Sequence, residues 1–203
     1  PHTWNALDGN DGGNDYFRGN GYYAKALDKM DLPEADRYYL EIQGANSSAD
    51  VYLNGKHLAH HDGGYSTWRV DITETLEREN LFAIVVNNEA NEIVYPQMAD
   101  FTFYGGLYRD VNIICVNESH FDLEYYGSNG VKITPEVVEK DAKVEILTTV
   151  TNKKEGQTIR YTIYAADGEE VAKVETAETK AVLEIKDVHL WHGRKDPYLY
   201  CAC

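Results

Sequence analysis

The sequence predicts an all-β protein built from two β-sandwich domains. Short runs of strand-forming residues recur along the whole chain, and turn-forming pairs such as Asn54-Gly55 and Asp167-Gly168 separate several of them. Sixteen tyrosines agree with this fold class, because a tyrosine combines an apolar ring with a hydroxyl that stays in contact with water. No stretch places apolar residues at helical spacing over the roughly 11 residues that a helix prediction needs.

The first domain is expected to span residues 1–117. Its clearest element is a hairpin around Asn54-Gly55, in which Val51 and Leu53 share one face of the first strand. Residues 80–87 form the most apolar run of the chain and are expected to be a core strand. The strands predicted for this domain are residues 21–27, 37–42, 49–53, 56–61, 80–87 and 111–116.

The second domain is expected to span residues 118–203, because the composition shifts near residues 117–120 and shorter strands follow at regular spacing. About seven short strands over about eighty residues is the size of an immunoglobulin-like sandwich. The strands predicted here are residues 121–126, 131–135, 142–152, 158–165, 170–176 and 181–186.

The charge of the chain excludes some classes of partner. A formal net charge of −15 argues against nucleic acid and against an anionic membrane surface, since both attract clustered lysine and arginine. A neutral ligand such as a carbohydrate is compatible with this charge, although the charge alone does not select one. No apolar run is long enough to cross a membrane.

Both ends of the sequence read as cut. The chain begins at Pro1 and stops at Cys203 within what reads as a strand, so we expect a piece of a longer protein. Its compartment, the periplasm or the cytoplasm of a bacterium, stays open. The three cysteines are too few for a disulfide framework. Cys201 and Cys203 would point the same way on one strand without bridging comfortably, so we expect free thiols.

Two polar clusters have the composition of a metal site. Residues 8–15 crowd carboxylates, amides and glycines together, but the twelfth position of that run is Gly19 where a calcium loop has glutamate. His60-His61-Asp62 offers zinc ligands, but neighbouring strand residues point to opposite faces. We therefore interpret both as loop and turn chemistry. Arg109-Asp110 is expected to form an ion pair that holds a turn.

The order of several motifs is similar to that of family 2 glycoside hydrolases, and most similar to their β-galactosidase branch. The motifs are PHTWN (1–5), FRGNGYYAK (17–25), the segment SADVYLNGKHLAHHDGGYSTWRVDIT (48–73), DFTFYGGLYRDV (100–111) and LWHGRKDPYLY (190–200). This resemblance implies a galactose-binding-like jelly roll, then an immunoglobulin-like sandwich, then a (β/α)₈ barrel that carries catalysis. The barrel would begin after Cys203, so it would be the main partner of this chain.

The resemblance also implies that no catalytic residue lies in these 203 residues. Retaining glycosidases need two carboxyl groups about 5 Å apart, and in this family both come from the barrel. Asn88-Glu89 resembles the family's acid/base pair, but it follows a sandwich strand and no second carboxylate accompanies it. No cofactor is expected in this part of the enzyme, and whether the full enzyme binds a monovalent or divalent cation, or forms a homo-oligomer, stays open.

Three residues are expected to bind substrate. By the resemblance, Asp100 reaches the active site, accepts a hydrogen bond from a sugar hydroxyl and helps to hold a monovalent cation once the barrel is present. A carboxylate suits this role because it can accept from adjacent hydroxyls. Asn20 matches a substrate-facing asparagine only loosely, and Arg18 competes for the same place. The alternative for Asp100 is an aspartate that caps a loop.

The function predicted from these observations is the non-catalytic sugar-binding part of a β-galactosidase. The alternatives are the same part of a β-glucuronidase or β-mannosidase, or a free-standing carbohydrate-binding or adhesion module. The sequence that follows Cys203 would separate the enzymes from the free-standing module.

Overall fold

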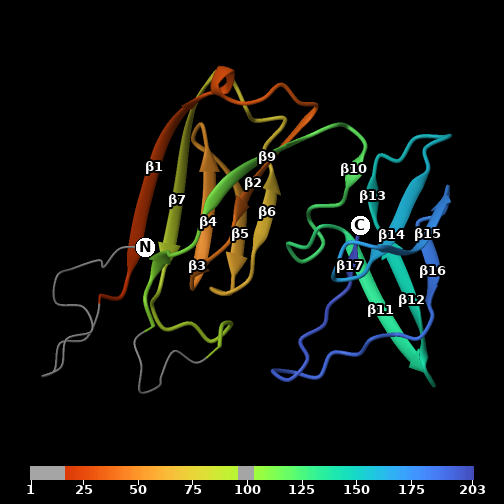
Figure 1. Ribbon diagram of the computed structural model, residues 1–203. Helices are drawn as coiled ribbons and strands as arrows, with labels where there is room; N and C mark the ends of the chain where they lie inside the picture. The colour runs from red at the N-terminus through yellow and green to blue at the C-terminus, as the bar shows by residue number, and fades with distance from the viewer. Residues whose placement is uncertain (1–16, 96–102) are drawn as a thin grey trace, which may run out of the picture. The chain divides into compact units, whose positions relative to one another are not determined.

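A computed structural model describes residues 17–95 and 103–203 (Figure 1). The chain divides into two compact units. The first contains the described residues up to Glu118 together with Glu124–Ser128, and the second contains Ser119–Leu123 and Asn129–Cys203. The short segment Glu124–Ser128 therefore packs with the first unit, although it follows the predicted boundary.

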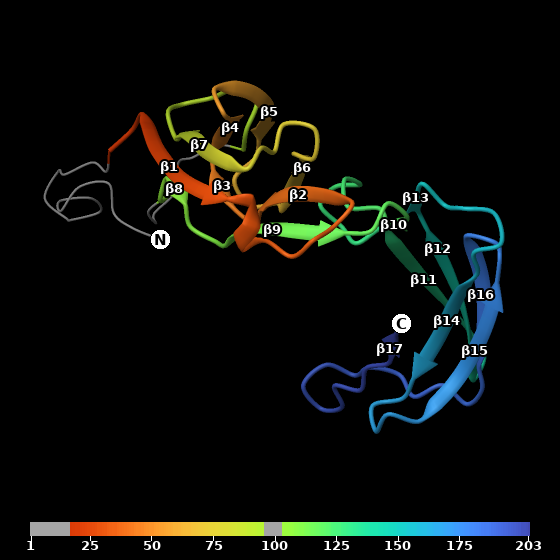
Figure 2. The ribbon, with the colours of Figure 1, turned by 90° about the horizontal axis from the view of Figure 1, so that it is seen from above.

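The first unit is a β-sandwich whose sheets have the strand orders β1-β7-β4-β5 and β6-β2-β9, with a short pair β3-β8. Figure 2 shows β9 beside β2 in the second of these sheets. All pairings are antiparallel. The elements are β1 (Asn20–Asp28), the 3₁₀ turn η1 (Lys29–Asp31), β2 (Arg37–Ile42), β3 (Ala45–Asn46), β4 (Ser48–Leu53), β5 (Lys56–Asp62), β6 (Trp68–Asp71), β7 (Glu79–Asn87), β8 (Gly106–Leu107) and β9 (Val111–Val116).

Alternating apolar residues of the two sheets meet in the core of this unit. On β7 the buried positions alternate with more exposed ones, as expected for a strand with one face in the core. This matches the prediction that residues 80–87 are a core strand. The buried apolar side chains contributed by the long strands are Leu40, Ile42, Ala49, Val51, Leu53, Trp68, Phe82, Ile84 and Val86.

The hairpin between β4 and β5 has the predicted turn. Asn54 and Gly55 have φ values of 53° and 81°, as a type I′ turn requires. The return strand carries a β-bulge, because Val51 pairs with Ala59 and Tyr52 pairs with His57. The extra residue shifts the alternation of side chains along β5, so His57 and His60 lie on the same face.

The second unit is a smaller sandwich with sheets β11-β12-β16 and β15-β14-β17 and a short pair β10-β13. Its core is separate from that of the first unit and comes mainly from β12, β14 and β16. The elements are β10 (His120–Phe121), β11 (Val131–Val138), β12 (Asp141–Thr148), β13 (Val150–Thr151), β14 (Ile159–Tyr164), β15 (Glu170–Thr176), β16 (Lys180–Ile185) and β17 (Cys201–Ala202).

Three strand predictions in the second half were wrong in extent. The strand expected at 121–126 is limited to β10, because Tyr126 adopts a φ of 49° in a turn. The strand expected at 142–152 is interrupted at Thr149. The strand expected at 131–135 continues through Pro135 to Val138. A proline is tolerated there because β11 is an edge strand.

Candidate functional site

One end of the first sandwich gathers the loops that carry the candidate residues. β1 begins beside the end of β7, where Asn20 pairs with Asn87, and the start of β4 and the end of β5 meet at the same level. We call this region the loop end, and it comprises the described residues 17–20, 43–48, 62–66, 87–95 and 103–108. Polar and aromatic side chains dominate it.

The structure brings Arg18 and Asn20 together with the end of β7. The amide Oδ1 of Asn20 accepts a hydrogen bond of 2.7 Å from Nδ2 of Asn87. The guanidinium Nη1 of Arg18 donates to the backbone oxygen of Asn88 at 2.9 Å. Both Arg18 and Asn20 are exposed, so their side chains can meet a ligand at the loop end.

Asn88 is the residue that fixes the path of the chain beneath these two side chains. Its side chain is 1% exposed. Its Oδ1 accepts from the backbone N–H of Gly19 at 2.8 Å, and its Nδ2 donates to the backbone oxygen of Phe17 at 2.8 Å. We call this arrangement of Phe17, Gly19 and Asn88 the Asn88 clamp.

The Asn88 clamp also restricts the residue type at position 105, because Gly105 packs against the side chain of Asn88. A Cβ added to Gly105 would lie 2.6 Å from Nδ2 of Asn88, so only glycine fits there without a shift. Sequence reasoning missed this role of Asn88, because its partners lie 69 to 71 residues away in the chain.

Asp100 lies outside the described residues, but the chain on both sides of it is anchored at the loop end. Tyr95 donates its hydroxyl to Oδ1 of Asn46 at 2.6 Å, and Nδ2 of Asn46 donates to the backbone oxygen of Tyr104 at 2.7 Å. Burial and a hydrogen bond with Tyr65 raise the pKa of Tyr95, so its phenol stays protonated at neutral pH. The substrate-binding and cation-binding roles of Asp100 remain predictions.

Glu89 takes part in a local turn at the same end. Its backbone N–H donates to Oδ1 of Asn87 at 2.7 Å, and its carboxylate accepts from Nδ2 of Asn87 at 3.1 Å. Turns of this kind are frequent at asparagine, because its side chain can take the place of a backbone group.

His60 and His61 point to opposite faces of β5, as predicted. His60 contacts Oδ1 of Asp50 at 3.0 Å and Oδ2 of Asp62 at 3.1 Å, whereas His61 stacks on the core residue Trp68 with ring centroids 4.9 Å apart. The hydrogen bond with Asp50 is the main cause that raises the pKa of His60. Among the described residues, no group of three or more His, Cys, Asp and Glu side chains could hold a metal ion. The run at 8–15 lies outside the described residues.

The prediction of an ion pair between Arg109 and Asp110 is wrong. Arg109 instead donates from Nη1 to the backbone oxygens of Tyr65 at 2.9 Å and Gln43 at 3.4 Å, and its guanidinium lies over the ring of Tyr108. Asp110 contributes its backbone oxygen, which accepts from the N–H of Gln43. Arg109 thus ties together two loops of the loop end through backbone atoms.

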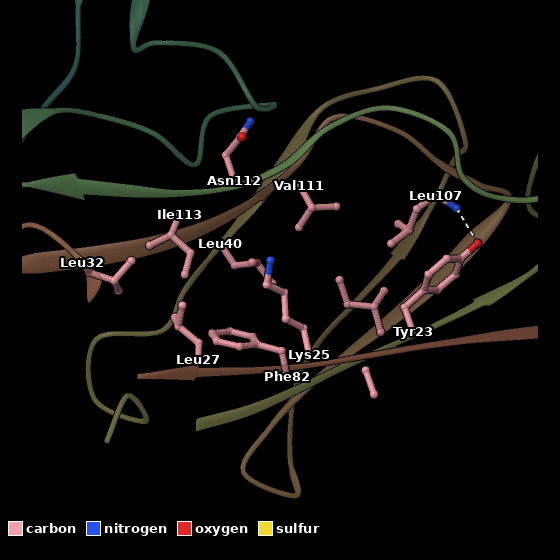
Figure 3. A pocket seen from close by; sticks show the side chains of 12 residues that line it. Tyr23, Lys25, Leu27, Leu32, Leu40, Phe82, Leu107, Val111, Asn112 and Ile113 are labelled. Atoms are coloured by element: carbon pink, nitrogen blue, oxygen red, sulfur yellow. Dashed lines mark hydrogen bonds between the residues drawn. The ribbon is translucent and has the colours of Figure 1, made fainter. Parts of the chain in front are cut away.

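A groove of about 540 Å³ lies between the edge strands β1 and β9 and shares only Leu107 with the loop end (Figure 3). Its lining is mostly apolar, as Leu27, Phe82 and Ile113 illustrate, and Lys25 is its one charged lining residue. A sugar needs several convergent polar partners, so the loop end is the better candidate for carbohydrate. No helix among the described residues has the length and apolar character that a membrane span requires.

Two family models match the two units of the chain. Residues 18–104 match the model described as "Glycosyl hydrolase 2 galactose-binding domain-like", and residues 129–202 match the model described as "Glycosyl hydrolases family 2". Together with the two sandwiches, these matches define a non-barrel part of a glycoside hydrolase. The chain belongs to glycosyl hydrolase family 2, which confirms the predicted family and the all-β fold.

Known relatives extend well beyond this chain. A β-glucuronidase of Bacteroides fragilis is 35% identical over 213 residues, covering 98% of this chain and 31% of the relative. The crystal structure of an FMN-binding β-glucuronidase from Facaelibacterium prausnitzii L2-6 is 41% identical with a TM-score of 0.89, covering 98% of this chain and 32% of that one. The structure of a putative β-galactosidase from Bacteroides fragilis is 34% identical with a TM-score of 0.86, with the same coverage. The chain thus spans about a third of the length of these relatives.

Proposed function

We propose that this chain is the N-terminal part of a family 2 glycosidase and that its loop end forms one wall of the sugar subsite. The observation that carries this proposal is the meeting of exposed Arg18 and Asn20 on a backbone held by Asn88. A rigid backbone beneath exposed polar side chains suits sugar recognition, because the positions of the hydrogen-bonding groups are set before the ligand arrives.

Catalysis would belong to the barrel of the full enzyme. The mechanism of retaining glycosidases needs an acid/base and a nucleophile about 5 Å apart, held by rigid elements. In this proposal the barrel supplies both carboxyl groups, and the present chain binds and orients the sugar. Asp100 would accept a hydrogen bond from a sugar hydroxyl there and help to hold a cation.

We infer a β-glucuronide as the substrate, because relatives named β-glucuronidases are 35% and 41% identical over 98% of the chain. The chemistry of Arg18 supports this inference. A guanidinium can bind a carboxylate through two parallel hydrogen bonds, and a glucuronide carries a carboxylate that a galactoside lacks. The second candidate is a β-galactoside, which the 34% identity to a putative β-galactosidase favours.

The test of the subsite uses the full-length enzyme and nitrophenyl glycosides. Asp100→Asn keeps the shape but removes the charge, and a charged hydrogen bond is worth roughly 1.5–3 kcal/mol. We expect kcat/KM to fall by about ten- to a hundredfold. Unchanged kcat/KM together with a loss of stability would show that Asp100 caps a loop instead.

The test of the substrate compares two glycosides in the same enzyme. Arg18→Gln should lower kcat/KM for the nitrophenyl β-glucuronide and leave that for the β-galactoside unchanged. Lys25→Gln is the matched control, because Lys25 is also an exposed cation of the first unit but lines the groove rather than the loop end. Equal losses on both glycosides would reject Arg18 as the group that selects a uronate.

The 203-residue chain by itself should hydrolyse neither glycoside, and turnover that disappears in Glu89→Gln would overturn the assignment of catalysis to the barrel.

A further inference from the structure

Two cysteine side chains lie side by side on the surface of the second unit. Cys201 and Cys203 are both exposed, and Ala202 between them packs against the core. Side chains alternate along a strand, so the two thiols share the outward face. Their Sγ atoms are 3.8 Å apart.

The backbone that carries these thiols is fixed by its neighbour β14. Cys201 pairs with Tyr164 and Ala202 pairs with Ile163. Beyond them, the N–H of Cys203 donates to the oxygen of Thr162 and the N–H of Thr162 donates to the oxygen of Cys203, both at 2.8 Å. The separation of the two sulfur atoms is therefore set mainly by side-chain rotamers on a fixed strand.

This separation matches the requirement of a tetrahedral metal ion. Zinc binds thiolate sulfur at about 2.3 Å, and two such ligands at a tetrahedral angle lie about 3.8 Å apart. A disulfide needs about 2.05 Å between the sulfur atoms and prefers Cα atoms about 5.5–6 Å apart. Two residues of an extended strand span about 6.7 Å, which is close to the upper end of the range that disulfides tolerate.

We propose that Cys201 and Cys203 form a two-thiolate site for a thiophilic divalent cation such as Zn²⁺ or Cd²⁺. Binding replaces the two thiol protons by the metal ion, so each ion bound releases two protons. Because no third His, Cys, Asp or Glu of the described residues completes a cluster, water or an added ligand fills the remaining coordination positions. The proposal is independent of the sugar-binding function.

The proton dependence of the site follows from the chemistry of the thiols. A thiol binds a metal ion as the thiolate, so both protons of this pair must leave when the ion binds. A metal ion competes with these protons, and its affinity should increase with pH.

The experiment titrates the reduced 203-residue chain with Zn²⁺ alone in competition with a chromophoric chelator, and with Cd²⁺ alone while the thiolate–cadmium ultraviolet band is recorded. We expect one ion per chain. Cys201→Ser and Cys203→Ser should each lower the zinc affinity at least tenfold and abolish the cadmium band.

Cys115→Ser is the matched control. Cys115 is half-buried on β9 and packs against the core of the first unit, so this variant should retain the full zinc affinity and the cadmium band. Circular dichroism checks that all three variants fold. Equal zinc affinity in the original chain and in a folded Cys201→Ser variant would overturn the proposal, as would a cadmium band that disappears only in Cys115→Ser.

Discussion

Removing the side chain of Asn88 should destabilise the first unit selectively. In Asn88→Ala the N–H of Gly19 and the oxygen of Phe17 lose partners that both lie at 2.8 Å. Each lost hydrogen bond costs about 1 kcal/mol, and more where water cannot replace it. Because Phe17 is exposed and Gly19 is half-buried, water reaches part of the gap, and we expect a total of about 2 kcal/mol.

The measurement is urea unfolding of the original chain and the variant, followed by circular dichroism. With a slope of about 2 kcal/mol per molar urea, a loss of about 2 kcal/mol lowers the midpoint of the first unit by about 1 M. The transition of the second unit should not move, because its core is separate.

Two further variants make this prediction specific. Asn88→Asp keeps an acceptor for Gly19 but places a second oxygen where Nδ2 now donates to Phe17, so it should be destabilised as well. Asn87→Ala removes only hydrogen bonds that are exposed to solvent and should change stability by less than about 0.5 kcal/mol. Equal urea midpoints of the first unit in Asn88→Ala and Asn87→Ala would refute the claim that the Asn88 clamp stabilises this unit.

Two other predictions concern the first unit. Gly127→Ala should be strongly destabilising, because its Cβ would lie 1.9 Å from the backbone oxygen of Thr67. Gly55→Ala is the control in the same unit: Gly55 also has a positive φ, but nothing lies within 4 Å of its Cβ, so a smaller loss of the urea midpoint is expected. Burial alone would raise the pKa of Glu41, but hydrogen bonds from neighbours that include Arg69 lower it below the usual 4.5. A carboxyl whose folded-state pKa is lowered stabilises the fold above its unfolded pKa and loses this effect as the pH falls through the folded value. Urea midpoints measured from pH 7 down to pH 3 should therefore fall less in Glu41→Gln than in the original chain. An equal fall of the midpoint with pH in both proteins would contradict a lowered pKa of Glu41 in the folded state.

Local patterns predicted the parts of the fold that local chemistry decides. The turn at Asn54-Gly55 needs only two residues that tolerate positive φ, and it formed as expected. The strand predicted at 121–126 failed because tyrosine favours strands in general, whereas Tyr126 precedes Gly127, which packs against the backbone of Thr67. No pattern within a short window reports that contact.

The candidate site was predicted unevenly for the same reason. The motif order singled out Arg18 and Asn20 because both belong to one short segment, and the structure shows both exposed at the loop end. Their roles in binding substrate stay predictions. The motif order could not locate the Asn88 clamp, which joins residues 69 to 71 positions apart. The adjacent opposite charges of Arg109 and Asp110 predicted an ion pair, but the guanidinium of Arg109 instead reaches the backbone oxygen of Tyr65, 44 residues away.

The Asn88 clamp holds its loop entirely through backbone atoms of Phe17 and Gly19. The side chain of Arg18 adds a separate hydrogen bond, from Nη1 to the backbone oxygen of Asn88, but neither bond of the clamp uses a side-chain atom of residue 18. Under the proposed function, substitutions at position 18 or 20 would change the selectivity for a ligand while both bonds of the clamp stay in place. A fold of this kind separates the residue that must be kept from the residues that are free to diversify.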